Sequence, residues 1–275
     1  MTITERNNVQ VIGRPDAPDT LLFAHGFGTS QQVWQDVAAG FVDTHRIVLL
    51  DNVGANDATV AYFDPQRYNH LRAYANDLLD IMEDLALRNV TFVGHSMGGM
   101  TGVLAALQEP DWFGRLVLLN ASPHYRNEPD YVGGFDTDTL EELFWQMDRN
   151  FYAWASGFAP LAMRNPARPQ LAQQYAQSLQ AMRPDVALAV AKLIFLSDHR
   201  AEVAQLTHPT LLIQTANDLA VPPEVSLYLK QVIPNATLVF LDADGHYPHI
   251  SAPDAVVKTI RSFLNEFTTH GLEGI

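Results

Sequence analysis

Residues 94–98 read Gly-His-Ser-Met-Gly, a spacing that places one serine between two glycines. The preceding run, 90–93, is β-branched and aromatic, whereas 97–108 has the small and apolar residues of a buried helix. On a sharp turn from strand to helix the serine hydroxyl is exposed, and the glycines let neighbouring backbone come close. The pattern therefore predicts that Ser96 is a nucleophile. The alternative, a serine that only caps the helix, leaves the glycines unexplained.

A second turn, His25-Gly26-Phe27-Gly28, follows the apolar run 21–24. Glycines on both sides of Phe27 free its backbone N–H to point toward an oxyanion, and Met97 supplies a second N–H directly after the serine. A plain tight turn is the alternative for this motif alone. Taken together with Ser96, the turn predicts an oxyanion hole made by the backbone N–H groups of Phe27 and Met97.

A serine hydroxyl needs a base, and the chain has ten histidines. Functional groups of parallel sheets collect at the carboxyl ends of the strands. His246 follows the last apolar run, 237–241, and Gly245 directly before it lets the loop bend inward. His249 lies nearby but lacks such a glycine. We therefore predict that His246 is the base.

The acid is predicted from the preceding strand. Asp218 lies where the run 210–214 ends, and a carboxylate there can orient His246 and stabilise its protonated form. An Asx turn ahead of a proline is the structural alternative. Asp242 and Asp244 compete for the role but lie too close in sequence to His246 to be preferred. The resulting order, serine then aspartate then histidine, is that of α/β-hydrolases.

Composition excludes several other classes of function. The 275 residues carry a net charge of −14, and no cluster of lysines and arginines offers a basic face to nucleic acid or to an anionic membrane. The absence of cysteine removes thiolate catalysis and cysteine-based zinc sites, and is typical of a cytoplasmic protein. The polar start, 1–8, has no signal-peptide core, and no apolar run is long enough to cross a membrane.

Metal and nucleotide sites are not expected. His246 and His249 are three residues apart, but Pro248 between them prevents the helix that a two-histidine metal face requires. The sequence contains neither a Gly-x-Gly-x-x-Gly fingerprint nor a phosphate-binding loop. We therefore expect no metal and no cofactor.

Strand-like runs alternate with helical patterns, which predicts an α/β fold with a mostly parallel central sheet flanked by helices. The strand predictions are 21–24, 46–50, 90–93, 116–119, 210–214 and 237–241. The helix predictions are 31–39, 71–87, 97–108, 223–232 and 253–267. The tail, 268–275, is expected to fray.

The alternation breaks once, after the strand that ends at residue 119. Between 123 and 207 no run has the character of a buried strand, and amphipathic segments near 138–155, 168–181 and 185–196 are separated by prolines. Ordinary crossover helices are the alternative, but roughly 85 residues far exceed a usual connection. We expect 123–207 to be an inserted helical cap, and 1–122 with 208–275 to form the core.

Several runs resemble the bacterial RsbQ-type stress regulators and their plant relatives, the karrikin and strigolactone receptor hydrolases. They are 130–135 (Asp-Tyr-Val-Gly-Gly-Phe), 154–161 (Trp-Ala-Ser-Gly-Phe-Ala-Pro-Leu), 182–185 (Met-Arg-Pro-Asp), 195–198 (Phe-Leu-Ser-Asp) and 245–253 (Gly-His-Tyr-Pro-His-Ile-Ser-Ala-Pro). The resemblance covers nearly the whole chain. It implies an α/β-hydrolase core with a four-helix, V-shaped lid above an apolar pocket that opens onto the serine.

The resemblance also implies a set of pocket positions. In this chain they are Phe27, Phe135, Trp154, Phe158, Tyr175, Phe195 and Ala220. Aromatic residues that only hold cap helices together are the alternative. The chain departs from the family in three places. Ala55-Asn56-Asp57 replaces a common second glycine, His124 stands where arginine is common, and Tyr175 replaces a frequent phenylalanine, which would bring a hydroxyl into the pocket.

Two functions follow from the resemblance. One is a monomeric serine hydrolase that cleaves esters or enol-ether lactones of small hydrophobic molecules. The other is a ligand-responsive signalling module whose slow hydrolysis serves a protein partner, which for the bacterial relatives is a sensor phosphatase. Dehalogenases and epoxide hydrolases need a carboxylate at the position of Ser96 and are disfavoured. Both remaining functions use one fold and one site, so the residues alone leave the choice open.

Overall fold

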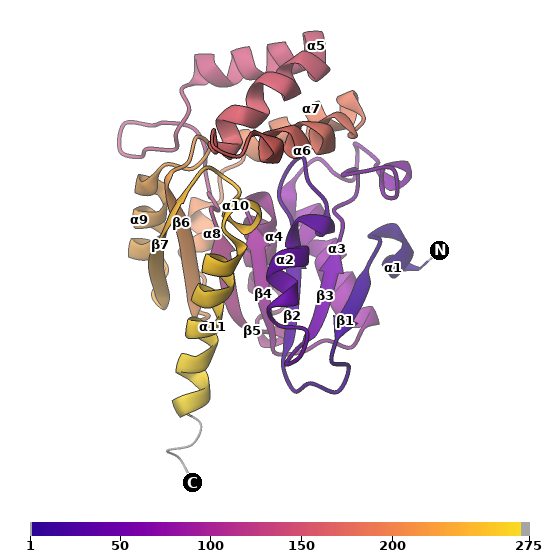
Figure 1. Cartoon of the computed structure of the whole chain (residues 1–275), viewed down its shortest axis with the longest axis vertical. Coiled ribbons are helices and arrows are strands. Elements are labelled where there is room, and N and C mark those ends of the chain that lie inside the picture. Colours follow the sequence, from indigo (N-terminus) through magenta and orange to yellow (C-terminus); the bar gives the residue numbers. More distant parts are fainter. Residues whose placement is uncertain (1, 271–275) are drawn as a thin grey trace.

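The computed structural model describes residues 2–270, and its centre is a seven-stranded sheet with the strand order β1-β3-β2-β4-β5-β6-β7 (Figure 1). Every neighbouring pair is parallel except β1 and β3, which are antiparallel. The strands are β1 (Gln10–Gly13), β2 (Thr20–Ala24), β3 (Arg46–Leu50), β4 (Val90–His95), β5 (Phe113–Leu119), β6 (Thr210–Asn217) and β7 (Ala236–Asp244). The predicted mostly parallel sheet is confirmed.

Strand β1 is the one strand of this sheet that the sequence pattern missed. Its four residues are all exposed, so it lacks the apolar alternation or buried run by which the other strands are recognised. It pairs with β3 at the edge of the sheet. Its position there is set by backbone hydrogen bonds, which leave no mark on the side-chain pattern.

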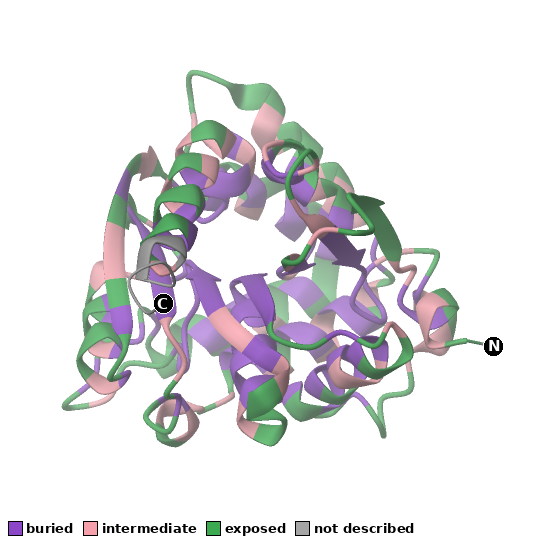
Figure 2. Cartoon of the chain, turned by 90° about the horizontal axis from the view of Figure 1, so that it is seen from below, coloured by how far each residue is buried: buried purple, intermediate pink, exposed green. Residues whose placement is uncertain are grey.

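Helices cover both faces of the sheet, and the sheet separates two apolar cores. On β2, Leu22 points into the core shared with α3 and α4, whereas Leu21 points into the core shared with α2 and α11. Figure 2 shows the buried strands enclosed by helices whose outer faces are exposed. These helices are α1 (Ile3–Arg6), α2 (Gln35–Ala39), α3 (Leu71–Asp84), α4 (Met97–Gln108), α8 (Arg200–Val203), α9 (Pro223–Val232), α10 (Pro248–Ser251) and α11 (Pro253–His270).

Some helix ends differ from the predictions. Helix α3 stops at Asp84, three residues early, because Ala86 adopts a positive φ of 50° that an α-helix does not allow. The predicted helix 31–39 begins as a 3₁₀ turn, Gln31–Trp34, before α2. Helix α11 continues to His270, into the tail that was expected to fray, and residues 271–275 lie outside the described part of the chain.

Three helices, α5 (Thr137–Met163), α6 (Pro169–Gln180) and α7 (Pro184–Phe195), lie in the segment between β5 and β6 and pack together at one end of the sheet (Figure 1). Helix α5 bends sharply at Asn150, which has non-helical dihedral angles, and the Asn150 side chain accepts a hydrogen bond from the N–H of Ala153 to start the second arm. Two arms of α5 with α6 and α7 make four helical segments. No helix within residues 2–270 combines the length and the apolar character that crossing a bilayer would require.

Candidate active site

Ser96 lies on the turn between β4 and α4 with φ +53° and ψ −122°, a strained conformation for a residue with a side chain. A Cβ on Gly98 would come within 2.6 Å of the carbonyl oxygen of Ala24, and one on Gly94 within 2.7 Å of the Gly98 backbone. Both positions therefore require glycine. The Ser96 side chain makes no capping hydrogen bond to α4, which removes the alternative of a simple helix cap.

The three side chains predicted to act together are in contact. His246 Nε2 lies 2.9 Å from Ser96 Oγ, and His246 Nδ1 lies 2.7 Å from Asp218 Oδ2. The Asp218 side chain has no solvent exposure and that of His246 is 6 % exposed. A carboxylate accepts the Nδ1 proton, so the unprotonated Nε2 faces the serine hydroxyl. The arrangement can move a proton from Ser96 to His246 while Asp218 stabilises the resulting charge.

Asn120 holds the aspartate and was not found from the sequence. Its Nδ2 donates to Asp218 Oδ2 at 2.7 Å and also reaches Thr215 Oγ1 at 3.0 Å. The N–H of Ala220 donates to the other carboxylate oxygen, Asp218 Oδ1, at 2.7 Å. The sequence feature that could have indicated Asn120 is its position directly after β5, because functional groups collect at the carboxyl ends of parallel strands. These donors fix the orientation of the carboxylate toward His246.

The competing carboxylates lie elsewhere. Asp242 and Asp244 are both exposed, and Asp244 Oδ1 accepts a hydrogen bond from Asn217 at 2.6 Å. Neither forms an ion pair or a hydrogen bond with His246 among the interactions of residues 2–270. Asp218 is therefore the carboxylate that the fold brings to the histidine.

The turn that carries Phe27 passes beside Ser96. A Cβ on Gly26 would lie 3.2 Å from Ser96 Cβ, and Gly28 has a φ of +72°. Met97 is the first residue of α4, where backbone N–H groups have no partner inside the helix. Phe27 and Met97 thus lie on the two backbone segments that flank Ser96, as an oxyanion hole requires.

Tyr125 is a second residue that the sequence did not indicate. Its hydroxyl lies 3.4 Å from Ser96 Oγ, and its ring meets Phe195 edge to face at 5.0 Å. Burial raises the pKa of the Tyr125 hydroxyl, which therefore stays protonated at neutral pH. A protonated hydroxyl at this distance can donate to the nucleophile oxygen or to a substrate atom bound beside it.

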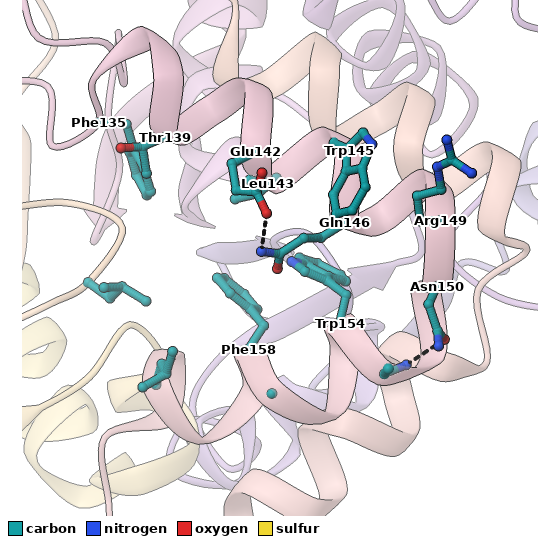
Figure 3. A pocket seen from close by; sticks show the side chains of 14 residues that line it. Phe135, Thr139, Glu142, Leu143, Trp145, Gln146, Arg149, Asn150, Trp154 and Phe158 are labelled. Carbon is teal, nitrogen blue, oxygen red and sulfur yellow. Dashed lines mark hydrogen bonds between the residues drawn. The ribbon is translucent and has the colours of Figure 1, made fainter.

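A cavity of about 710 Å³ opens between the two arms of α5 (Figure 3). Phe135, Trp154 and Phe158 line it, and the last two stack with ring centres 5.0 Å apart. Phe195 contacts Phe135 at 5.3 Å and also Tyr125, so a layer of aromatic rings lies between the cavity and Ser96. Ser96, Asp218 and His246 are not among the residues that line the cavity. The opposite arm adds polar side chains, and Figure 3 shows Gln146 donating to Glu142.

The remaining predicted pocket residues lie outside that lining. Phe27 lines a small recess next to Met97, and Ala220 is buried beside Asp218. Tyr175 is buried too, but its hydroxyl bonds to the hydroxyl of Tyr247 beside the Phe27 turn. The expectation that Tyr175 brings a hydroxyl into an apolar pocket is thus not met by the geometry, because a phenol partner holds that hydroxyl.

The other two departures from the family also have local roles. His124 Nδ1 lies 2.8 Å from the carbonyl of Ser197 and its Nε2 lies 3.3 Å from Glu128, so it joins the two ends of the insertion. Asn56 donates to Asp51 Oδ2 at 3.0 Å and accepts from the N–H of Ala58, which closes its loop. Neither residue faces the cavity. Within residues 2–270, no group of three or more potential metal-ligating side chains is present.

Two further buried histidines, His95 and His249, lie near His246. The His95 ring lies 4.7 Å from that of His246 and 4.4 Å from that of His249, and His95 Nε2 donates to the carbonyl of His246 at 2.7 Å. Burial, reinforced by the neighbouring histidines, lowers the pKa of His95 well below its ordinary value and that of His249 to about 3. Both rings therefore remain neutral at physiological pH.

Because these histidines have lowered pKa values, we expect the free energy of unfolding to fall in mild acid. Below about pH 6.5 the unfolded chain binds a proton at His249 that the folded chain excludes, so the free energy of unfolding falls as the pH falls. The loss is about 1.4 kcal/mol per pH unit for each such group until its folded-state pKa is reached. Urea unfolding of the parent and of His249→Phe between pH 7.5 and 4.5 should show the shallower slope in the variant. Parallel curves would contradict the assignment.

Comparisons with known proteins agree with the fold. A profile of the alpha/beta hydrolase fold matches residues 19–253. The chain is 39% identical over 259 residues to Karrikin insensitive 2 receptor CA of Petunia hybrida, covering 94% of this chain and 95% of that protein. It is 39% identical over 263 residues to Strigolactone esterase D14 of Arabidopsis thaliana, covering 95% and 97%.

Solved structures agree as well. A hydrolase from Oleispira antarctica superposes with a TM-score of 0.92 at 32% identity over 96% of both chains. The enol-lactonase from Burkholderia xenovorans LB400 superposes with a TM-score of 0.81 at 23% identity, over 94% of this chain and 95% of the enol-lactonase, which shows the shared fold. The chain belongs to the α/β-hydrolase family. The resemblance to the plant receptor hydrolases is confirmed, and the protein is an enzyme of the ester hydrolase class.

Proposed function

We propose that this protein cleaves esters or lactones of small hydrophobic molecules, with Ser96 as nucleophile, His246 as base and Asp218 as the orienting acid. The observation that supports this most directly is the unbroken hydrogen-bonded line from Asp218 Oδ2 through His246 to Ser96 Oγ. The backbone N–H groups of Phe27 and Met97 are the proposed oxyanion donors. Residues 123–207 are the proposed cap.

In the first half of the reaction, His246 Nε2 takes the proton of Ser96 as the serine oxygen attacks the carbonyl carbon. The carbonyl oxygen becomes an oxyanion that the two N–H groups stabilise, and removal of one such donor typically costs about 3 kcal/mol. Collapse breaks the ester bond, and the leaving oxygen takes the proton from His246. In the second half, His246 deprotonates a water molecule that attacks the acyl group, and the proton returns to Ser96 as the acid departs.

The substrate class follows from the apolar surroundings of Ser96 and from the relatives. Tyr125, Phe195 and Phe135 form an aromatic layer between Ser96 and the cap, and such rings favour flat or apolar groups. The names of two relatives, a karrikin receptor and a strigolactone esterase, agree with a small ligand that is bound and cleaved. Enol-ether lactones fit this class because ring opening uses the same acyl transfer to serine.

Covalent labelling tests the proposal directly. Phenylmethylsulfonyl fluoride should transfer its sulfonyl group to Ser96 with loss of fluoride, since only an activated serine reacts readily. We expect peptide mass spectrometry to place the added mass on the peptide that contains residue 96, together with loss of turnover of 4-nitrophenyl acetate. A Ser96→Ala protein should take up no label. Label on another serine, or full activity after stoichiometric labelling, would contradict the mechanism.

A second function, ligand-dependent signalling, is favoured by one contact. The backbone N–H of His246 donates to the carbonyl of Ala162, near the end of α5, at 2.8 Å, so the cap is bonded to the residue proposed as base. Acylation or ligand binding at the serine would then alter the cap, which a protein partner such as a sensor phosphatase could read. Slow turnover with a large ligand-dependent change in cap hydrogen exchange supports this role, whereas rapid turnover of many esters with an unchanged cap excludes it.

The cellular setting is part of the proposal. We expect a monomer in the cytoplasm, in keeping with the absence of cysteine and the charge of −14. Neither nucleic acid nor a membrane is an expected partner.

A further inference from the structure

Two cap helices contact the loops that carry the proposed base and one proposed oxyanion donor. On α5, the carbonyl of Ala162 accepts a hydrogen bond from the His246 N–H. Helix α6 packs against the turn at Gly28, where a Cβ would lie 2.3 Å from Leu179 and 3.1 Å from the Tyr175 hydroxyl. Only glycine leaves room for this approach. The cap therefore rests directly on the Phe27 turn.

Two tyrosine hydroxyls join α6 to that turn. Tyr247, the residue after the proposed base, lies with its hydroxyl 3.3 Å from the carbonyl oxygen of Phe27 and in hydrogen-bond contact with the hydroxyl of Tyr175 on α6. The two rings lie 4.3 Å apart, and each residue is 2 % exposed. Water therefore does not replace either hydrogen bond.

The Tyr247 hydroxyl bridges the cap and the turn. It donates to the hydroxyl of Tyr175 and to the carbonyl of Phe27, which only accepts. One phenol proton is thus shared between an acceptor on helix α6 and an acceptor on the turn. We refer to this chain from Tyr175 through Tyr247 to the Phe27 carbonyl as the relay.

The turn needs such support. Glycines flank Phe27 on both sides, and Gly28 has a φ of +72°, so local steric preferences restrain this backbone weakly. An oxyanion donor, however, acts only when its N–H is aimed at the developing charge to within a few tenths of an ångström. The peptide that carries the Phe27 N–H is held at its Gly26 carbonyl by the Thr29 hydroxyl at 2.9 Å. The bond from Tyr247 to the Phe27 carbonyl holds the next peptide, so the two bonds together fix the orientation of Phe27.

We propose that Tyr247 and Tyr175 are positioning residues, through which helix α6 of the cap holds Phe27 in its oxyanion-binding orientation. This inference rests on the proposed hydrolysis. It makes the placement of the cap a condition for fast acyl transfer, without any contact between these tyrosines and the reacting atoms.

Kinetics of phenylalanine variants test the relay. Tyr247→Phe removes the bond to Phe27 and should lower kcat about tenfold with KM nearly unchanged, because only transition-state binding is lost. Tyr175→Phe leaves Tyr247 able to donate and should cost about threefold, but nothing further in the Tyr247→Phe background. The affinity for an aryl trifluoromethyl ketone, which forms an oxyanion on Ser96, should fall in parallel with kcat. Tyr152→Phe removes an exposed phenol of the cap and should change none of these values.

Three results would overturn the relay. They are an unchanged kcat in Tyr247→Phe, a further fall in kcat when Tyr175→Phe is added to Tyr247→Phe, and a rise in KM with kcat unchanged. Hydrogen exchange separates the relay from the proposed function. Amides of residues 26–29 should exchange faster in Tyr247→Phe than in the parent or in Tyr152→Phe, whether or not the protein turns over an ester. If Ser96→Ala keeps full activity, the proposed hydrolytic mechanism is wrong. The hydrogen exchange of residues 26–29 still shows whether Tyr247 holds the turn. Should Tyr247→Phe not fold, the same measurements on Tyr175→Phe decide it.

Discussion

Ser96→Ala is expected to lower kcat for a small aryl ester by about 10⁵-fold or more, which leaves only the residual rate from oxyanion binding and substrate positioning. The reason is the loss of the covalent step, since no other nucleophile is predicted to lie against His246 Nε2. Removal of one oxygen from a strained turn should not unfold the protein. The thermal midpoint should stay close to that of the parent, and binding of an unreactive substrate analogue should be retained.

Ser262→Ala is the matched control for that experiment. Ser262 is exposed on α11, far from the turn that carries Ser96, so the same atom is removed without any contact to the site. We expect parental activity. Active-site titration of the purified Ser96→Ala protein excludes contaminating parental enzyme. If that protein still kept a tenth or more of the parental kcat, Ser96 would not be the nucleophile, since an intact oxyanion hole alone cannot supply that rate.

Asp218→Asn should lower kcat by about 10⁴-fold, with little change in KM. The amide is nearly isosteric, but its NH₂ group cannot accept the Nδ1 proton of His246. The imidazole then places its proton on Nε2, facing Ser96, where an acceptor is needed. Asn120 adds to the effect, because its Nδ2 donates to Asp218 Oδ2 and would face another donor after the substitution.

Asp244→Asn separates the two candidate acids. Asp244 lies on β7, two residues before His246 in sequence, yet its carboxylate is exposed and accepts from Asn217. Its replacement should leave kcat within about twofold of the parent, as expected for a surface carboxylate. If Asp244→Asn proved the more damaging variant, Asp218 would lose its assigned role.

Most of the fold could be predicted from the pattern of apolar side chains. The same dependence on apolar runs explains which elements were missed. Strands buried on both faces leave continuous apolar runs, as at 46–50 and 210–214, and these were found. Strand β1 is exposed along its whole length and carries no such run. The end of α3 was missed because a positive φ at Ala86, which has no special propensity for it, follows from packing and not from residue type.

The candidate site divides in the same way. Ser96, Phe27 and Met97 lie in short motifs whose glycines encode close backbone approach, so their placement could be inferred locally. Asn120 and Tyr125 occupy loops with no motif, and their contacts with Asp218 and Ser96 depend on strands and loops that meet only in the folded chain. Their residue types are common in loops for unrelated reasons.

By itself, then, the sequence determined a serine on a strand-to-helix turn, the chain order of the proposed acid and base, and an inserted helical segment. Local sterics and apolar periodicity suffice for these. Tertiary structure alone decided which carboxylate meets His246, that Tyr125 reaches Ser96, and that the Tyr175 hydroxyl faces Tyr247 and not the cavity. These three pairings join residues that are 28, 29 and 72 positions apart in the sequence. Their geometry comes from the packing of whole elements, which no local window of sequence contains.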